Sequence, residues 1–170
     1  MIAYTICFVR SGDRLLLVNR QFAPNQGLWN GVGGKIEPGE RPLAAVIREV
    51  GEETGIPLKT ARFAGLVTWG DRYDEIRGGM YAYMAEVAEP LPAGPLETPE
   101  GILAWKELGW VLDPENEGVV SNIPRFLPVM LQDPVPYEHR CLYRHGLLRA
   151  VIRHQLPAEG DLATGTNRQR

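Results

Sequence analysis

Three glutamates lie close together in one short segment of the chain, at Glu49, Glu52 and Glu53. Their i, i+3 and i+4 spacing places the three carboxylates on one face of a helix. Like charges at this spacing repel one another by about 0.2 to 0.5 kcal/mol per pair in an isolated helix, so a bridging cation would relieve that cost. Carboxylate oxygens suit Mg²⁺ or Mn²⁺, and Mg²⁺ commonly connects carboxylates to substrate phosphates. The spacing therefore indicates a metal and phosphate site; the alternative is a solvated acidic face balanced by Arg41 and Arg48.

The segment around these glutamates has the start and stop signals of a helix. Pro42 suits a first turn, where its missing N–H has no helical partner, and Gly55 followed by Pro57 ends the helix. These signals predict a helix over residues 41–54. A second stripe of this helix is expected to pack against the rest of the protein, and it consists of Leu43, Ile47, Val50 and Thr54.

A glycine-rich turn, residues 31–35, comes directly before the acidic helix. Its sequence is G-V-G-G-K. Glycines let the backbone approach a ligand closely, as turns that handle phosphate require. With the helix directly behind it, the turn makes Gly33 and Lys35 candidate site residues, whereas an ordinary glycine turn is the alternative.

Residues 34–56 as a whole resemble the Nudix box. Gly34, five residues, Glu40, seven residues and then R-E-V-G-E-E-T-G-I match G-x5-E-x7-R-E-U-x-E-E-x-G-U at every defined position. The chain is similar to Nudix hydrolases, which implies an α/β fold, namely an α/β/α sandwich with a mixed central sheet and a loop-helix-loop catalytic motif. The resemblance also implies hydrolysis of a nucleoside diphosphate linked to another moiety, with a divalent metal.

The same resemblance implies roles for the residues of the box. Arg48 would orient the glutamates, Gly34 and Glu40 would support the loop, and Lys35 would meet phosphate. Mg²⁺, or Mn²⁺ in its place, would be coordinated by the Gly33 carbonyl, Glu49, Glu52 and Glu53.

The general base has two candidate positions. MutT-like relatives point to Glu49. Related enzymes use a glutamate on the loop before the strand that holds Trp105, and in this chain that residue would be Glu100 or Glu97. The resemblance therefore implies a catalytic set of Arg48, Glu49, Glu53 and Glu100.

Within the Nudix group, the chain resembles the MutT branch and its animal oxidised-purine relatives. The W-N-G-V-G-G-K run that begins at Trp29 is similar to W-N-G-F-G-G-K of the animal enzymes, and P-E-N-E, which contains Asn116, is similar to the bacterial P-A-N-E turn. The asparagine of that bacterial turn reads oxidised guanine, and an amide can donate to and accept from a purine edge. The resemblance implies Asn116 and Asn30 as base contacts beside Trp29, while a turn or helix-cap role is the alternative for Asn116.

These features predict an Mg²⁺-dependent nucleoside triphosphate pyrophosphohydrolase that releases a nucleoside monophosphate and pyrophosphate, with 8-oxo-dGTP as the preferred substrate. Where the animal enzymes carry two acidic residues for the base, this chain has Ser121 and Asn122, so their broad specificity does not carry over. The alternative enzyme is a dinucleoside polyphosphate hydrolase, supported by Tyr73 at the position where that subgroup carries a tyrosine. The alternative of another class is a nucleotide-sensing module without turnover.

Composition bounds the remaining possibilities. A chain of 170 residues with 44% hydrophobic residues predicts one domain, residues 1–156, with a frayed tail at residues 157–170. A net charge of −3 gives no footprint for a nucleic-acid polymer, so we expect a small nucleotide partner and a monomer or homodimer. The chain has neither an apolar run of about 20 residues nor a secretory signal, which predicts no membrane partner and a cytoplasmic location. Cys7 and Cys141 are expected to be reduced core thiols.

The remaining elements follow from runs of apolar residues and from turn residues. Hairpins are predicted at residues 2–10 with 14–19 and at residues 138–144 with 147–154, and further strands at residues 60–70, 76–88 and 102–106. Residues 89–99 are predicted to be a proline-rich loop. Residues 119–132 are predicted to form a helix that Pro124 and Pro128 break or kink.

Overall fold

The first two strands carry continuous apolar runs, and successive residues of each run supply opposite faces of a central sheet. In the computed structural model, which describes residues 2–156, β1 (Tyr4–Ser11) and β2 (Arg14–Arg20) form the predicted antiparallel hairpin. Phe8 and Leu17 lie in one buried apolar cluster, whereas Cys7 and Leu16 lie in a second. Because successive strand residues point to opposite faces, the two clusters lie on opposite sides of the sheet.

The central sheet is mixed. Its strand order is β6-β7-β2-β1-β5-β4-β8-β9, and a short strand, β3 (Trp29–Asn30), pairs with β2. The β1–β5 and β4–β8 pairs are parallel, and the other pairs are antiparallel. The remaining strands are β4 (Arg62–Gly70), β5 (Gly78–Glu86), β6 (Leu96–Thr98), β7 (Gly101–Glu107), β8 (Tyr137–Arg144) and β9 (Leu147–Gln155).

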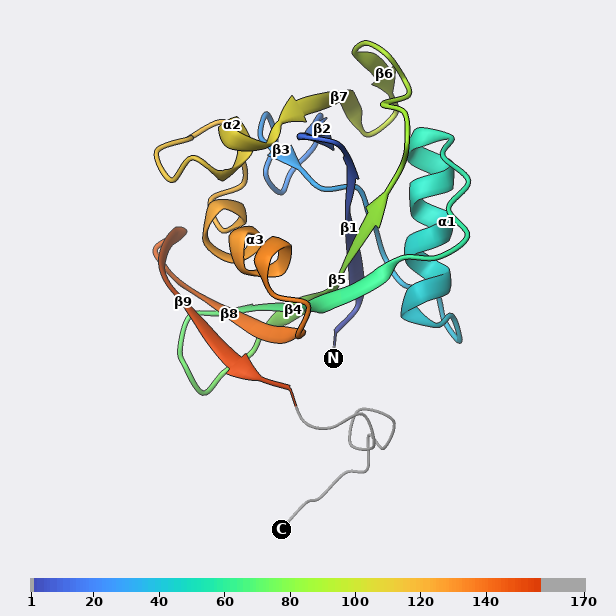
Figure 1. Cartoon of the computed structure of the whole chain (residues 1–170). Helices are drawn as coiled ribbons and strands as arrows, with labels where there is room; N and C mark the ends of the chain where they lie inside the picture. The colour runs from blue at the N-terminus through green and yellow to red at the C-terminus, as the bar shows by residue number, and fades with distance from the viewer. Residues whose placement is uncertain (1, 157–170) are drawn as a thin grey trace.

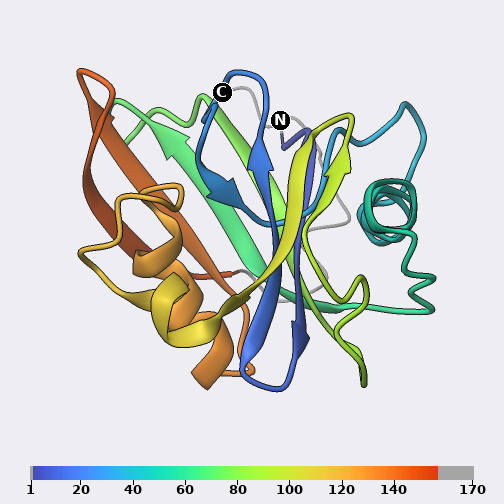
Figure 2. The ribbon, with the colours of Figure 1, turned by 90° about the horizontal axis from the view of Figure 1, so that it is seen from above.

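Helices cover both faces of this sheet. The helix α1 (Pro42–Thr54) lies on one side, and α2 (Leu108–Leu112) and α3 (Ile123–Gln132) lie on the other, as Figures 1 and 2 show. Val46 and Val50 of α1 belong to one apolar cluster, whereas Phe126 of α3 belongs to the other. This arrangement confirms the predicted α/β/α sandwich.

The ends of α1 lie where the sequence predicts them. The helix begins at Pro42, and Gly55 ends it with a left-handed backbone (φ 74°) while its N–H donates to the Gly51 carbonyl. A residue with a side chain would be strained in that conformation, which explains the glycine stop signal.

The buried face of α1 differs from the predicted stripe. Leu43 is 39% exposed, and the buried residues of the helix are Ala45, Val46 and Val50. The helix turns Val46 and Val50 to the sheet, and Ala45 beside them is buried as well, whereas Ala44 is exposed. The assignment of Leu43 to the core was therefore wrong, whereas Ile47 packs against the buried cluster as predicted.

Three further elements differ from the predictions. The proline-rich loop contains β6, which pairs with the start of β7, and α2 was not predicted. The helix predicted over residues 119–132 begins only at Ile123. It does not break at Pro124, because this proline lies in the first turn, whereas Pro128 lies inside the helix.

The two cysteines are free and buried, as predicted. Burial raises the pKa of the Cys7 thiol to about 12 and that of Cys141 to about 11, so both stay protonated. Among residues 2–156, no helix is long and apolar enough to cross a membrane. The predicted tail at residues 157–170 lies outside the described residues.

Candidate active site

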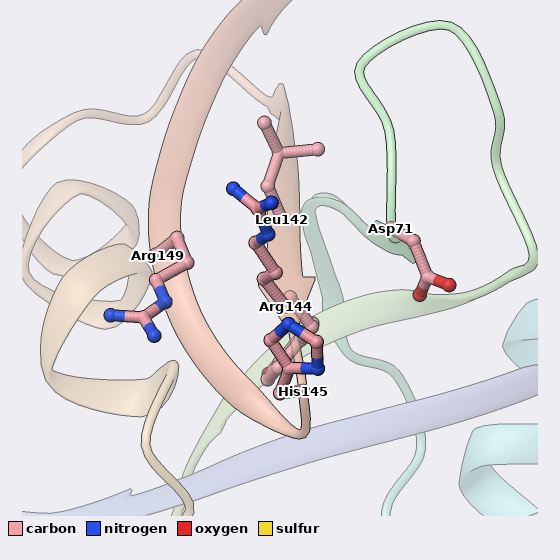
Figure 3. Close-up of a pocket in the computed structure, with 6 residues that line it drawn as sticks. Asp71, Leu142, Arg144, His145 and Arg149 are labelled. Atoms are coloured by element: carbon pink, nitrogen blue, oxygen red, sulfur yellow. The ribbon is translucent and has the colours of Figure 1, made fainter.

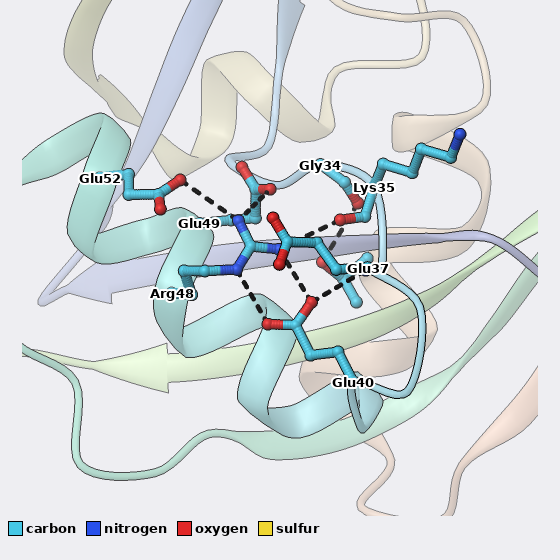
Figure 4. Close-up of polar contacts among 8 residues, drawn as sticks. Gly34, Lys35, Glu37, Glu40, Arg48, Glu49 and Glu52 are labelled. Carbon is cyan, nitrogen blue, oxygen red and sulfur yellow. Dashed lines mark hydrogen bonds and ion pairs between the residues drawn. The ribbon is translucent and has the colours of Figure 1, made fainter.

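The guanidinium of Arg48 is the centre of the polar network on α1 (Figure 4). Its Nη1 donates to Glu49 Oε1 at 2.8 Å and to Glu52 Oε2 at 3.2 Å. Its Nε and Nη2 donate to the two oxygens of Glu40 at 2.8 and 2.9 Å, and Nη2 also donates to the Lys35 carbonyl at 3.2 Å. The network therefore connects the acidic helix to the glycine-rich turn that precedes it.

Glu40 fixes the turn between the glycines and the helix. Besides the two hydrogen bonds that its carboxylate accepts from Arg48, its Oε2 accepts the backbone N–H of Glu37 at 3.0 Å. The Arg48 hydrogen bond, followed by the Glu37 N–H, lowers the pKa of Glu40 to about 2. The same contact with Glu40, and then the one with Glu49, raises the pKa of Arg48. This pair stays ionised at any working pH, as a supporting bridge requires.

At two glycines of the turn, an added Cβ would come too close to neighbouring atoms for these atoms to stay in place. A Cβ on Gly34 would lie within about 2.6 Å of the Glu49 carboxylate, and a Cβ on Gly33 would collide with the Thr5 carbonyl. The Gly34 carbonyl accepts the Thr5 N–H at 2.8 Å, so strand β1 holds the turn in place. The glycines therefore allow backbone and carboxylate to meet directly.

Glu53 lies on the inner side of the acidic face. Burial, and then the charges of Glu49 and Glu100, raise its pKa to about 8, while Arg20 and a hydrogen bond with the Gly33 backbone oppose the rise. Glu100 follows β6, and its carbonyl accepts the Gln21 N–H at 2.9 Å. The fold thus brings Glu100 from a distant turn to the carboxylates of α1, and their negative charges are incompletely balanced by Arg48 and Arg20.

The donor set of this site fits a hard divalent cation. It offers three carboxylates, and no backbone hydrogen bond within residues 2–156 occupies the Gly33 carbonyl. In the same part of the chain, no three His, Cys, Asp or Glu side chains converge closely enough to hold a metal ion as they stand. Arg48 explains this, because it holds the carboxylates of Glu49 and Glu52 on its own side. The Glu52 side chain is 61% exposed, so it has room to turn toward an ion.

Lys35, the predicted phosphate contact, lies next to this network. The Lys35 backbone is held by the bridge to Tyr4, and its side chain is exposed and points away from the carboxylates in Figure 4. The structure therefore brings the glutamates, Arg48 and the glycines together and leaves the Lys35 ammonium outside their network.

The predicted base contacts lie on a separate rim. The backbone N–H of Trp29 donates to the Gly118 carbonyl at 2.9 Å. The Lys106 ammonium lies 4.1 Å from the Trp29 ring centre and 5.3 Å from that of Trp110. Asn116 donates to the Trp110 carbonyl at 2.6 Å and accepts the Gly118 N–H at 2.8 Å. Its amide thus braces the turn, which is the alternative role that the sequence left open, and its use in base recognition stays a prediction.

Asn30 and Asn122 differ in how their amides are used. Asn30 Oδ1 accepts the N–H of Gly31 at 2.9 Å. Asn122 is 6% exposed, and its buried Oδ1 has no hydrogen-bond partner within residues 2–156. It lies beside the Tyr143 hydroxyl and donates to Cys141 Sγ at 3.8 Å. A buried amide oxygen without a partner is costly, so Asn122 is a candidate ligand contact that the sequence analysis did not select.

Known proteins share this fold and motif. The family model of the NUDIX domain matches residues 1–114. The crystal structure of the mutator MutT protein from Bacillus halodurans has a TM-score of 0.66 and 26% identity, and it covers 91% of this chain and 98% of that chain. A MutT NUDIX hydrolase from Burkholderia pseudomallei has a TM-score of 0.58 and 26% identity over 74% of this chain and 94% of that chain.

Curated relatives are similar over a shorter stretch. The NAD-capped RNA hydrolase NudC of Haemophilus influenzae is 39% identical over 80 residues, which are 46% of this chain and 30% of the relative. The diphosphoinositol polyphosphate phosphohydrolase 2 of Homo sapiens is 37% identical over 90 residues, 52% of this chain and 47% of the relative. The matched stretch therefore spans about a third to a half of the length of these relatives.

Proposed function

The chain belongs to the Nudix family, and from this premise we propose that it is an Mg²⁺-dependent nucleoside triphosphate pyrophosphohydrolase. Its products are a nucleoside monophosphate and pyrophosphate, and its preferred substrate is an oxidised purine nucleotide such as 8-oxo-dGTP. The observation that carries the proposal is the Arg48 network, in which one guanidinium holds Glu40, Glu49 and Glu52 against the glycine-rich turn. A merely solvated acidic face would not need such a brace.

The residues of this network each supply one requirement of anhydride hydrolysis. Glu49, Glu52, Glu53 and the Gly33 carbonyl would hold the divalent ion, which when bound would supply positive charge near the phosphate oxygens. Arg48 fixes the position of Glu49, and Glu49 takes a proton from the attacking water. The water oxygen then bonds to a phosphorus of the α–β anhydride, the bridging P–O bond breaks, and pyrophosphate leaves with the monophosphate as the second product.

Glu100 is the second candidate for the proton acceptor. It lies close enough to Glu53 for its charge to act on that carboxyl, although it comes from the turn between β6 and β7. Glutamine retains the shape of the side chain without its basicity. Loss of the general base should lower kcat/KM at least about 100-fold. Because Glu49 is also a proposed metal ligand, Glu100→Gln decides between the two residues: a loss of that size assigns the base to Glu100, and a clearly smaller loss assigns it to Glu49. Equal rates in both variants and the parent would exclude both residues.

Base recognition is proposed for the rim next to β3. Trp29 is the stacking surface, and the amides of Asn30, Asn116 and Asn122 are the hydrogen-bonding groups. Asn122 supports this proposal most directly, because its buried Oδ1 lacks a hydrogen-bond partner in the described part of the chain and a purine amino group or N–H could supply one. One well-placed amide contact is worth about 1 to 3 kcal/mol of discrimination between bases.

The alternative substrate, a dinucleoside polyphosphate, has weaker support. Tyr73 lies in the exposed loop between β4 and β5, where its ring contacts His154 at 5.7 Å between centres and the Arg140 guanidinium at 5.5 Å. These contacts explain the tyrosine without a ligand. The module without turnover remains the alternative of another class, and phosphate release in a coupled pyrophosphatase assay tests it: a parent as silent as Glu53→Gln across a nucleotide panel would favour that module.

Turnover of 8-oxo-dGTP beside dGTP tests the substrate preference. With Mg²⁺ and identification of both products, we expect a kcat/KM for 8-oxo-dGTP at least about tenfold above that for dGTP, since one discriminating contact is worth about 1.4 kcal/mol or more. Equal values for the two nucleotides would sink the oxidised-purine preference and leave the general hydrolase reaction standing.

A further inference from the structure

The hairpin of β8 and β9 carries positive charge that the rest of the molecule does not share. Residues 137–155 hold four arginines and one glutamate, a net charge of +3, whereas the whole chain has a net charge of −3. Glu138 is bound to Arg140 at 3.0 Å. The charge that remains belongs to Arg144, Arg149 and Arg153, and none of the three has a carboxylate partner among residues 2–156.

Two of these arginines line a hollow at the end of the hairpin. The hollow has a volume of about 580 Å³, and Figure 3 shows its side chains around the hairpin end, with Asp71 contributed by the neighbouring loop. Asp71 is already bound to Arg77 at 2.7 Å, so it does not balance the arginines. The lining residues are Asp71, Leu142, Tyr143, Arg144, His145 and Arg149.

The hollow lies apart from the carboxylates of α1 but at the same end of the sheet. Leu142 at the end of β8 is opposite Gly70 at the end of β4, and β4 in turn meets the start of β5. Tyr4 at the start of β1 pairs with the start of β5 and forms a bridge to Lys35. Three strand spacings of about 4.8 Å separate β1 from β8, roughly 14 Å across the sheet. A single phosphate group therefore cannot occupy both sites.

We propose that the hollow formed by Arg144, His145 and Arg149 is a second anion site, which binds a phosphate group without a metal ion. A guanidinium matches phosphate oxygens with two parallel N–H donors, and Arg144 and Arg149, which have no carboxylate partner among residues 2–156, both line the hollow. The phosphate has two available sources, free pyrophosphate or the phosphate chain of a nucleotide. The site goes beyond the proposed hydrolysis, since its binding needs none of the carboxylates on α1.

Titration with pyrophosphate in EDTA tests this site separately from the proposed reaction. Without metal, the carboxylates of α1 repel pyrophosphate, so any binding belongs to a basic site. We expect the parent to bind and the double variant Arg144→Gln/Arg149→Gln to bind at least about tenfold more weakly, because both charge-assisted contacts are lost. Glu52→Gln should bind like the parent, even if the proposed function fails.

Arg153→Gln is the matched control. Arg153 lies on the same strand as Arg149, is exposed and has no carboxylate partner in the described residues, but it stacks on the Tyr137 ring at 4.8 Å, outside the hollow. The arginine variants change exposed side chains, so we expect their midpoints of urea unfolding to equal that of the parent. This control should retain pyrophosphate binding.

GTP in the same titration distinguishes the two sources. Binding of GTP at least tenfold tighter than pyrophosphate, lost in the double variant, assigns the site to a nucleotide, and equal binding assigns it to free pyrophosphate. No binding of pyrophosphate in EDTA, binding that survives in the double variant, or an equal loss in Arg153→Gln would each overturn the proposal.

Discussion

The site is organised at the scale of single residues around one guanidinium. Arg48 donates to Glu40, Glu49 and Glu52 and to a backbone carbonyl, and its side chain is only 25% exposed. A lysine carries the same charge on one flexible ammonium and lacks the planar fork that makes these contacts simultaneously. The position of three carboxylates therefore depends on the shape of Arg48 as well as on its charge.

Gly34→Ala tests the close contact between the glycine-rich turn and the Glu49 carboxylate. The new Cβ would lie within about 2.6 Å of the Glu49 carboxylate, which must move because it is the flexible end of a side chain. We expect kcat/KM to fall about tenfold to 100-fold, since misplacing a catalytic group by about 1 Å has that effect. The free energy of unfolding should change by less than about 1 kcal/mol.

Gly94→Ala is the control for this change. A Cβ at Gly94 meets nothing within 4 Å, and its backbone is not left-handed. Steady-state kinetics and urea unfolding of both variants check the prediction. Activity of Gly34→Ala equal to that of Gly94→Ala would mean that the position of Glu49 does not matter for turnover.

At the scale of elements, the contact between β8 and α3 makes folding stability depend on pH. His139 of β8 is 1% exposed and lies against Phe126 of α3 with ring centres 6.0 Å apart. Burial, and then the charge of Arg153, lowers its pKa from 6.5 to about 4. The unfolded chain takes up a proton below about pH 6.5, whereas the folded protein does so only near pH 4.

The sign of the effect follows from this difference in proton uptake. The contribution of the neutral, buried His139 to the free energy of unfolding is fully present above pH 6.5. It is lost as the pH falls toward 4, and the total loss is on the order of 3 kcal/mol. Urea unfolding at pH 7.0 and 4.5 measures the loss. His139→Phe removes the titrating group, so it should lose less stability over this range than the parent. Equal losses in the two proteins would contradict the assignment of this dependence to His139.

The prediction of helices and strands from sequence succeeded where a single residue strongly favours one backbone conformation. Pro42 and Gly55 fixed the ends of α1, because a proline suits a first turn and a glycine suits a left-handed cap. The helix α2 was missed, since its five residues are too short to show a period. The strand β6 was missed because its pairing with β7 outweighs the local proline-rich composition.

For the candidate site, too, only the part that is continuous in sequence could be predicted. The turn and helix from Gly34 to Gly55 are continuous in sequence, so their mutual placement follows from the pattern. The resemblance to the animal enzymes places Asn122 near their acidic pair for the base, but the burial of its amide beside β8 depends on distant residues and has no local pattern. The choice between Glu97 and Glu100 likewise rests on how the turn after β6 folds back toward α1, and only the charge of Glu100 acts on Glu53.

At the scale of the whole molecule, the proposed metal site and the proposed base site are built from different elements. The acidic network comes from α1 and the turn before it, whereas the rim comes from Trp29 of β3, Trp110 of α2 and Asn116 in the segment after α2. Gly31 and Val32 connect the two regions, because they follow β3 directly and lead into the turn. A nucleotide whose base lies at the rim would thus have its phosphates directed toward α1, which is the whole-molecule arrangement that the proposed hydrolysis needs.

Binding of Mn²⁺, followed by electron paramagnetic resonance, tests the metal site on which the proposal depends most directly. We expect the parent to bind the ion, and Glu52→Gln and Glu53→Gln to bind it at least about tenfold more weakly, because each removes one carboxylate ligand. Glu107→Gln is the control, since Glu107 is an exposed glutamate bound to Arg14 at 3.1 Å, away from α1. Binding lost in the two α1 variants and kept in the control is the predicted result. Equal binding in all four proteins, or no binding in the parent, would contradict a metal site on α1.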